Sequence, residues 1–246
     1  MDKPTDLFVK ALLSAIGHKL VALLRIGSRE KLDETAFSDT DLILLGTDLD
    51  RESLRSIRHI VRNLDCLVDM PVIQKSELPS NPDSFQMGTH GCYFVRILKQ
   101  SRVIYGTNFF STYPEPSRAA IRASIFRKIA EYTWSARRSY IESNRERTIA
   151  QNYQLNSRIV KMVKDILWLQ DFADAYQYTG QQAITALQLD KRVILSRSDL
   201  DVLNLITDPR KRNSLASNMS EDFLENRIAL IEVLYAHAVT ILEGRL

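Results

Sequence analysis

The first hundred residues alternate between helix-like and strand-like patterns of apolar positions. An amphipathic stretch at 5–16 is followed by an almost continuous apolar run at 19–26, which ends at Gly27-Ser28. A second apolar run at 39–45 precedes a second amphipathic stretch at 50–63. Short apolar runs that stop at small or polar turn residues are typical of buried strands. The pattern therefore predicts a helix, two strands and a second helix in this order.

The segment that follows continues the mixed pattern up to about residue 112. We expect a third strand at 64–73, interrupted near its end by Pro71, because proline cannot donate to a sheet ladder. Residues 76–91 are rich in proline, glycine and small polar residues and predict a long loop. A short helix at 92–99 and a short strand at 103–106 follow it.

Beyond residue 116 the apolar positions follow a helical period almost throughout. Only two glycines and one proline occur between 117 and 246. The expected helices cover 117–143, 147–174, 180–189, 198–206 and 219–243. The predicted fold class is α+β, with a mixed-sheet N-terminal domain at 1–112 followed by an all-α helical-bundle domain at 113–246.

Composition and charge narrow the class of protein. The chain of 246 residues is 45% hydrophobic and 26% charged, which suits a globular protein with a substantial core. Its two cysteines, Cys66 and Cys92, have neither zinc-site nor disulfide-framework spacing, so a reducing compartment is expected. No apolar run approaches the roughly 18 to 20 residues of a membrane span. We therefore expect a cytoplasmic protein without a membrane partner.

Three aspartates carry the candidate chemistry. Asp39 and Asp41 open the second apolar run, and alternate side chains of a strand point to the same side. Asp69 lies in the third apolar run, where an unpaired carboxylate is costly to bury. Carboxylates that converge in this way repel one another unless a cation lies between them, and Mg²⁺ prefers such oxygen ligands. The three residues are the candidate metal ligands and catalytic residues.

The order and spacing of Gly27-Ser28-Arg29-Glu30, Asp39-Thr40-Asp41-Leu42 and Asp69 resemble the signature of the DNA polymerase beta-like nucleotidyltransferase superfamily. The resemblance extends over residues 20–74 and is strongest to the minimal and antibiotic nucleotidyltransferases. It implies that Gly27 and Ser28 bind the triphosphate of an NTP. Arg29, the next residue, is either a further phosphate-binding group or a solvated surface arginine. The resemblance also implies that Asp39, Asp41 and Asp69 hold two Mg²⁺ ions. The implied reaction transfers an NMP to a hydroxyl acceptor and releases pyrophosphate.

A basic segment in the helical half gives information about the class of acceptor. Residues 118–165 contain eleven Lys or Arg residues against four Asp or Glu residues, with Tyr132, Trp134, Tyr140 and Tyr153 among them. Such a surface suits RNA or another polyphosphate, or is an ordinary solvated face. Acidic residues nearer the C-terminus would suit a cationic small molecule. The acceptor is therefore a small molecule, a protein or RNA, and a second copy of the chain (a homodimer) is a further candidate partner.

Two other classes of function stay open at this point. A catalytically silent nucleotide-binding or antitoxin-like interaction module would keep the fold without turnover. A structural or nucleic-acid-binding protein would make the aspartates incidental. His90, between Gly88 and Gly91 in the long loop, is the histidine whose surroundings best suit a role in a site.

Overall fold

The computed structural model describes residues 3–26, 40–63, 68–88, 90–142, 149–172, 174–190, 193–208 and 220–244. These residues form two compact units, the first ending at Ala120 and the second beginning at Ile121. The first unit contains a sheet and helices, and the second is helical, so the predicted α+β fold class is confirmed. Among the described helices, none is long and apolar enough to cross a membrane.

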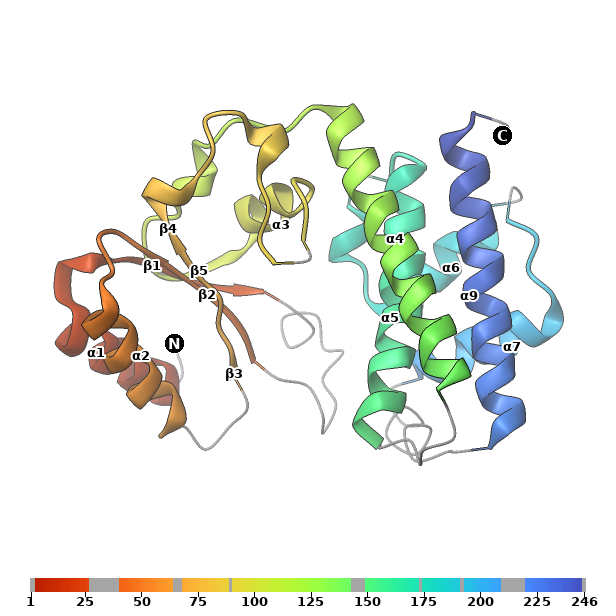
Figure 1. Ribbon diagram of the computed structural model, residues 1–246, viewed down its shortest axis with the longest axis horizontal. Coiled ribbons are helices and arrows are strands. Elements are labelled where there is room, and N and C mark those ends of the chain that lie inside the picture. Colours follow the sequence, from red (N-terminus) through yellow and green to blue (C-terminus); the bar gives the residue numbers. More distant parts are fainter. Residues whose placement is uncertain are drawn as a thin grey trace. The chain divides into compact units, whose positions relative to one another are not determined.

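A mixed sheet forms the centre of the first unit (Figure 1). Its strands are β1 (Leu20–Ile26), β2 (Thr40–Gly46), β3 (Val68–Asp69), β4 (Val72–Gln74) and β5 (Arg102–Gly106). The strand order is β3-β2-β1-β5, and β4 also pairs with β2. β1 runs antiparallel to β2 and β5, whereas β3 and β4 run parallel to β2. The strands predicted at 19–26, 39–45 and 103–106 are thereby confirmed.

The strand predicted at 64–73 is instead two short strands on the same edge of β2. The break falls at Met70-Pro71, between β3 and β4. Proline has no N–H to give to the ladder, but its carbonyl still pairs, because Leu44 N donates to Pro71 O at 3.0 Å. Residues 64–67 of the prediction lie outside the described residues. The proline thus divides the strand without detaching it from β2.

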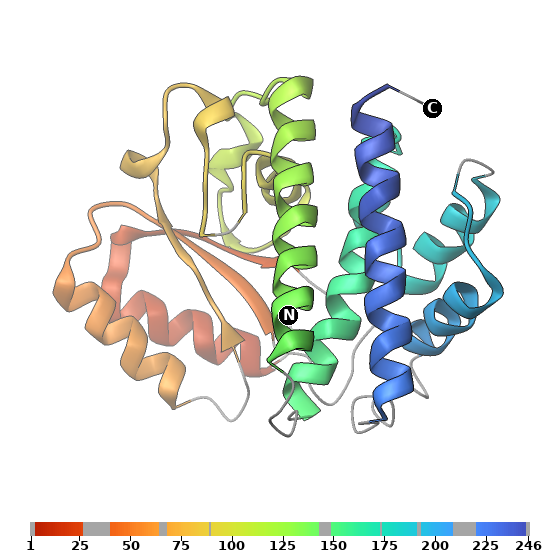
Figure 2. The same ribbon diagram turned by 45° about the vertical axis from the view of Figure 1, so that its right-hand side comes forward.

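Helices cover both faces of the sheet (Figures 1 and 2). α1 (Lys3–Ile16) and α2 (Arg51–Arg62) pack together on one face, where Leu12, Leu23 and Leu44 are fully buried. α3 (Phe94–Gln100) contacts β1 from the other face. Burial on both faces explains why the sequences of β1 and β2 are almost continuously apolar rather than alternating. Short 3₁₀ helices η1 (Gly17–Lys19), η3 (Lys75–Glu77), η4 (Pro82–Ser84) and η5 (Phe109–Ser111) lie in the connections.

The second unit is a bundle of α-helices. They are α4 (Arg118–Ile141), α5 (Ile149–Leu169), α6 (Gly180–Leu189), α7 (Arg197–Thr207) and α9 (Glu221–Leu242), with the 3₁₀ helix η6 (Ala175–Gln177) after α5. The prediction of one helix over 147–174 is wrong at its C-terminal end. The helix stops at Leu169, and Asp171 adopts a left-handed backbone with φ 72°. Backbone in this region ends an α-helix.

Basic side chains of α4 hold the bundle together. Arg122 donates to the carbonyl oxygens of Leu169 and Ile241, at 2.6 and 3.3 Å, near the C-terminal ends of α5 and α9. Helix C-termini expose unpaired carbonyls and carry partial negative charge, so one guanidinium satisfies two helix ends. Arg137 forms a bidentate pair with Glu232 of α9, with both N–O distances at 2.6 Å.

A buried ion pair lies between α4 and α5. Lys128 Nζ is 3.1 Å from Asp165 Oδ1, and the two side chains are 5% and 0% exposed. The Tyr176 hydroxyl also donates to Asp165. Burial lowers the pKa of Lys128 and raises that of Asp165, because it disfavours the charged form of each group. Each charge is therefore tolerated in the core only in the presence of the other.

We predict that Lys128→Met destabilises the second unit by about 3–5 kcal/mol, because it leaves the Asp165 carboxylate buried without its cation. Urea unfolding followed by circular dichroism measures the loss. The double variant Lys128→Met/Asp165→Leu is the control, since it removes both charges, and we expect it to recover most of the lost stability. A double variant as unstable as the single one would contradict this account.

Gly106 gives a second prediction. It lies at the end of β5 with φ 74°, and an added Cβ would meet the carbonyl oxygen of Val21. We expect Gly106→Ala to lower the free energy of unfolding by about 3 kcal/mol, through left-handed strain and displaced backbone. Gly17→Ala is the matched control, because its φ is 53° but nothing lies within 4 Å of the added carbon. Gly17→Ala should lower the free energy of unfolding by about 1 kcal/mol in the same urea titration. Equal losses in the two variants would show that the contact with Val21 adds nothing to the strain at Gly106.

Candidate active site

The sheet places two of the three candidate aspartates opposite each other on neighbouring strands. Asp41 is the second residue of β2 and Asp69 is the last residue of β3. In the parallel pairing of these strands, Asp41 is the register partner of Asp69, as Thr40 is of Val68. Neighbouring strands lie about 4.8 Å apart, so the backbones of the two aspartates approach closely although 28 positions separate them in the sequence.

The same row of the sheet continues into β1. Asp41 is also the register partner of Ile26, the last residue of β1. Ile26 directly precedes Gly27 in the sequence. One row across three strands therefore contains both aspartates and the residue that directly precedes Gly27-Ser28 in the sequence.

Other predicted site residues lie outside the described part of the chain. These are Gly27, Ser28, Arg29 and Asp39, and the side chain of Asp69 is likewise not described. Among the described side chains, no group of three or more His, Cys, Asp or Glu residues could hold a metal ion. Those side chains include neither that of Asp39 nor that of Asp69, so the assignment of the three aspartates as ligands stays a prediction.

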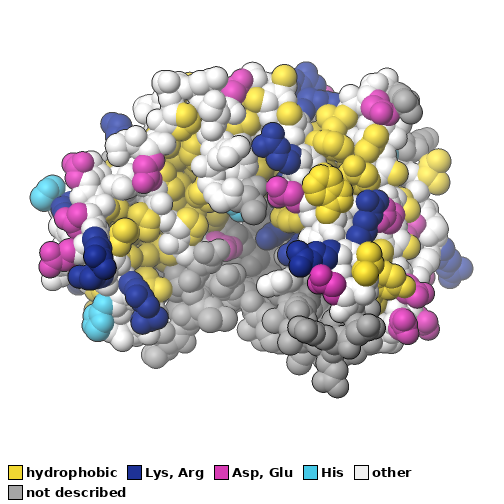
Figure 3. All heavy atoms as spheres, in the orientation of Figure 1, with side chains coloured by type: hydrophobic (Ala, Val, Ile, Leu, Met, Phe, Trp, Pro, Cys, Tyr) yellow, Lys and Arg dark blue, Asp and Glu magenta, His cyan; other side chains and the backbone are white. Residues whose placement is uncertain are grey.

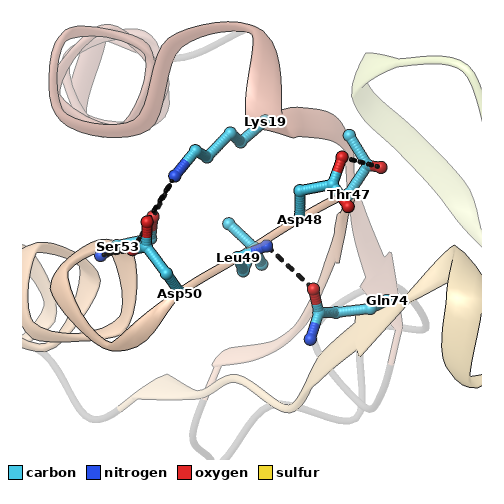
Figure 4. Close-up of polar contacts among 7 residues, drawn as sticks. All are labelled: Lys19, Thr47, Asp48, Leu49, Asp50, Ser53 and Gln74. Atoms are coloured by element: carbon cyan, nitrogen blue, oxygen red, sulfur yellow. Dashed lines mark hydrogen bonds and ion pairs between the residues drawn. The ribbon is translucent and has the colours of Figure 1, made fainter.

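The opposite end of β2 is anchored by polar contacts (Figure 4). Leu49 N donates to Gln74 Oε1 at 2.8 Å, which ties the turn after β2 to the end of β4. Lys19 Nζ donates to Asp50 Oδ2 at 2.8 Å and to Ser53 Oγ at 3.2 Å. The hydrogen bond from Lys19, with those from Ser53, holds the pKa of the Asp50 carboxyl well below its usual range.

Sequence patterns predict only one part of this anchor, the helix cap. Asp50 also accepts from Ser53 N at 2.8 Å, so it caps α2 as well as pairing with Lys19. The cap has a local signal, namely an aspartate directly before an amphipathic run. The partners of Lys19 and Gln74 are 31 and 25 positions away, and no local spacing indicates them. Together the contacts fix where β2 ends, and hence the register of Asp41.

His90 has a packing role in the described structure. Its Nδ1 lies 2.7 Å from the hydroxyl of Tyr93, and Tyr93 is a fully buried residue. Its ring stacks on Phe94, with centroids 4.5 Å apart and an interplanar angle of 11°. Met87 and His90 exchange two backbone hydrogen bonds, of 2.8 and 2.9 Å, across the turn. These contacts fasten the long loop to the start of α3.

Several residues of the basic segment are engaged within the helical unit. Of its eleven Lys and Arg residues, five bond to side chains or carbonyls of the same unit: Arg122, Lys128, Arg137, Arg138 and Arg158. Tyr140 likewise donates to Glu225 at 3.0 Å. Trp134 is 60% exposed. Much of the charge that suggested a polyphosphate surface therefore stabilises the bundle.

Comparisons with known proteins agree with this architecture. No family model and no curated protein matches the chain. Among solved structures, the chain is similar to the spectinomycin adenyltransferase AAD(9) from Enterococcus faecialis, crystallised with ATP and spectinomycin. The TM-score is 0.60 at 14% sequence identity, and the match covers 97% of this chain and 100% of the other. At this identity the likeness concerns the fold alone, with a mixed-sheet unit followed by a helical unit.

Proposed function

We propose that the chain is a nucleotidyltransferase that transfers an NMP from an NTP to a hydroxyl acceptor in a Mg²⁺-dependent reaction. The observation that carries the proposal is the pairing of Asp41 with Asp69 across two parallel strands, next to the end of β1. A carboxylate row at the edge of a nucleotidyltransferase fold is the donor set that two hard divalent ions need. The likeness to an adenyltransferase crystallised with ATP supports an NTP as donor.

The proposed metal ligands are Asp39, Asp41 and Asp69. The residues fit this role because the backbone brings Asp41 and Asp69 into register, and Asp39 precedes Asp41 by two positions. Bound Mg²⁺ would lower the charge on the triphosphate and make the acceptor oxygen a better nucleophile. Without a cation, the mutual repulsion of the carboxylates would raise their pKa values and weaken the site.

The triphosphate would be bound by residues 27–29, which follow β1 in the sequence. The backbone N–H groups of Gly27 and Ser28, the Ser28 hydroxyl and the Arg29 guanidinium would donate to its phosphate oxygens. The acceptor oxygen then forms a bond to the α-phosphorus, and the bond from the α-phosphorus to the bridging oxygen breaks. Pyrophosphate leaves with that bridging oxygen. We assign Asp69 as the group that takes the proton of the acceptor hydroxyl.

The acceptor class is tested directly by labelling. Purified protein is incubated with Mg²⁺ and each α-³²P-labelled NTP, together with small-molecule, protein or RNA fractions of a cell extract. We expect label to enter one fraction and pyrophosphate to be released in equal amount. The solved neighbour was crystallised with a small molecule, which makes that fraction the first to examine. Nucleotide binding without labelling of any fraction would favour the catalytically silent module instead.

Substitution of the paired aspartates tests the site. We predict that Asp41→Asn and Asp69→Asn each lower the rate of transfer by about 100-fold or more, because each removes a charged metal ligand. Asp48→Asn is the matched control, since Asp48 is an exposed aspartate beyond the other end of β2. It should keep the wild-type rate. Equal effects of all three changes would contradict the assignment.

A further inference from the structure

An arginine row runs along α2, on the outer surface of the first unit. It consists of Arg51, Arg55, Arg58 and Arg62, spaced by four, three and four positions. At 100° per residue, this spacing puts all four on one narrow stripe of the helix. The stripe extends about 16 Å, at a rise of about 1.5 Å per residue. Ser53 and Ile57, which are buried, lie on the opposite side of the helix.

All four arginines are exposed. In the described part of the chain, no hydrogen bond or ion pair joins the side chain of any of them to another residue. Figure 3 shows Lys and Arg side chains over α2 on the face turned to the viewer. The row therefore differs from the arginines of the second unit, such as Arg122 and Arg137, which bond within their own bundle.

Most of the arginine row does not help α2 to form. Arg51 is the first residue of the helix, where the partial positive charge of the helix end disfavours a cation, and only Arg62, in the last turn, is favoured by the opposite end. The pairs 51–55, 55–58 and 58–62 place like charges three or four positions apart, which destabilises a helix. Glu52 is the single acidic residue between Arg51 and Arg62. Aligned like charges that repel one another and have a single acidic residue among them suit a partner outside the chain.

We infer that the arginine row is a docking surface for the phosphate backbone of a nucleic acid. A polynucleotide strand presents a linear series of single negative charges, and the row presents a linear series of cations. The guanidinium group matches phosphate geometry with two parallel N–H donors. Contacts of this kind bind the backbone without reading its bases, so the surface recognises nucleic acid irrespective of sequence.

Features of α2 disfavour two other anionic partners. A helix that binds in a membrane interface inserts its apolar face, but Ile57 of α2 is buried in the core, beside α1. An acidic protein surface would be expected to contact apolar residues as well as charges. Leu54, at 45% exposure, is the one large apolar side chain of α2 that is exposed. A nearly pure row of guanidinium groups suits a highly charged polymer better.

The test measures binding of the full-length protein to a fluorescein-labelled 20-nucleotide RNA and to a 20-base-pair duplex at several salt concentrations. We expect affinity that falls steeply with salt. The variant with all four arginines changed to glutamine should bind about 100-fold or more weakly at 0.1 M salt. Its slope of log K against log salt should be smaller by about 3, because each lost phosphate contact removes about 0.7 to 0.9. Neither Mg²⁺ nor NTP is present, so the result is independent of the proposed transferase activity.

The matched control removes four exposed positive charges from scattered positions: Lys10→Gln, Lys75→Gln, Arg127→Gln and Arg197→Gln. It should bind within about threefold of wild type if the row, rather than net charge, is responsible. Both variants should keep the circular dichroism spectrum of the wild type. Equal loss in the two variants, or unchanged binding by the arginine-row variant, would overturn the inference. Stronger row-dependent binding to polyglutamate or to phosphatidylserine vesicles would overturn the choice of nucleic acid.

Discussion

The register of β2 between its two neighbours is the constraint on which the candidate site depends. β1 pairs with β2 antiparallel and puts Ile26 beside Asp41, while β3 pairs with it parallel and puts Asp69 there. A shift of one residue would move Asp41 to the other face of the sheet, because successive side chains alternate. The contacts of Leu49 with Gln74 and of Lys19 with Asp50 fix the far end of β2 against such a shift. Residues remote from the chemistry thus determine whether the carboxylates can act together.

Much of the fold follows from local patterns, whereas the site depends on pairings between distant residues. The apolar runs that end at Ile26 and Leu45 predict β1 and β2, and the amphipathic run that begins at Asp50 predicts α2, each to within one residue at both ends. Pro71 signals an interruption, but only the sheet shows that β3 and β4 both continue beside β2. The Asp-x-Asp spacing predicts a carboxylate cluster, and the partnership of Asp41 with Asp69 comes from tertiary structure. No sequence periodicity encodes the register of two strands joined through a helix.

The role of a basic residue depends on where the fold places it. The eleven Lys and Arg residues at 118–165 suggest a polyanion surface, yet Arg122 caps two helix ends and Lys128 is buried beside Asp165. The arginine row of α2 is a smaller group, but its members are exposed and aligned along one side of the helix. Charge that is satisfied inside a fold contributes to stability, and charge that remains exposed and aligned is available for a partner.

In the proposed function, Asp39, Asp41 and Asp69 hold divalent cations together with an NTP. Electron paramagnetic resonance of Mn²⁺, added in place of Mg²⁺ with a non-hydrolysable NTP analogue, measures this most directly. We expect two bound Mn²⁺ ions per chain, close enough to couple magnetically, as in two-metal sites with ions about 3.5 to 4 Å apart. In Asp41→Asn the coupled signal should disappear. A signal from free Mn²⁺ alone in the wild-type protein, or a coupled signal that persists in Asp41→Asn, would contradict this expectation.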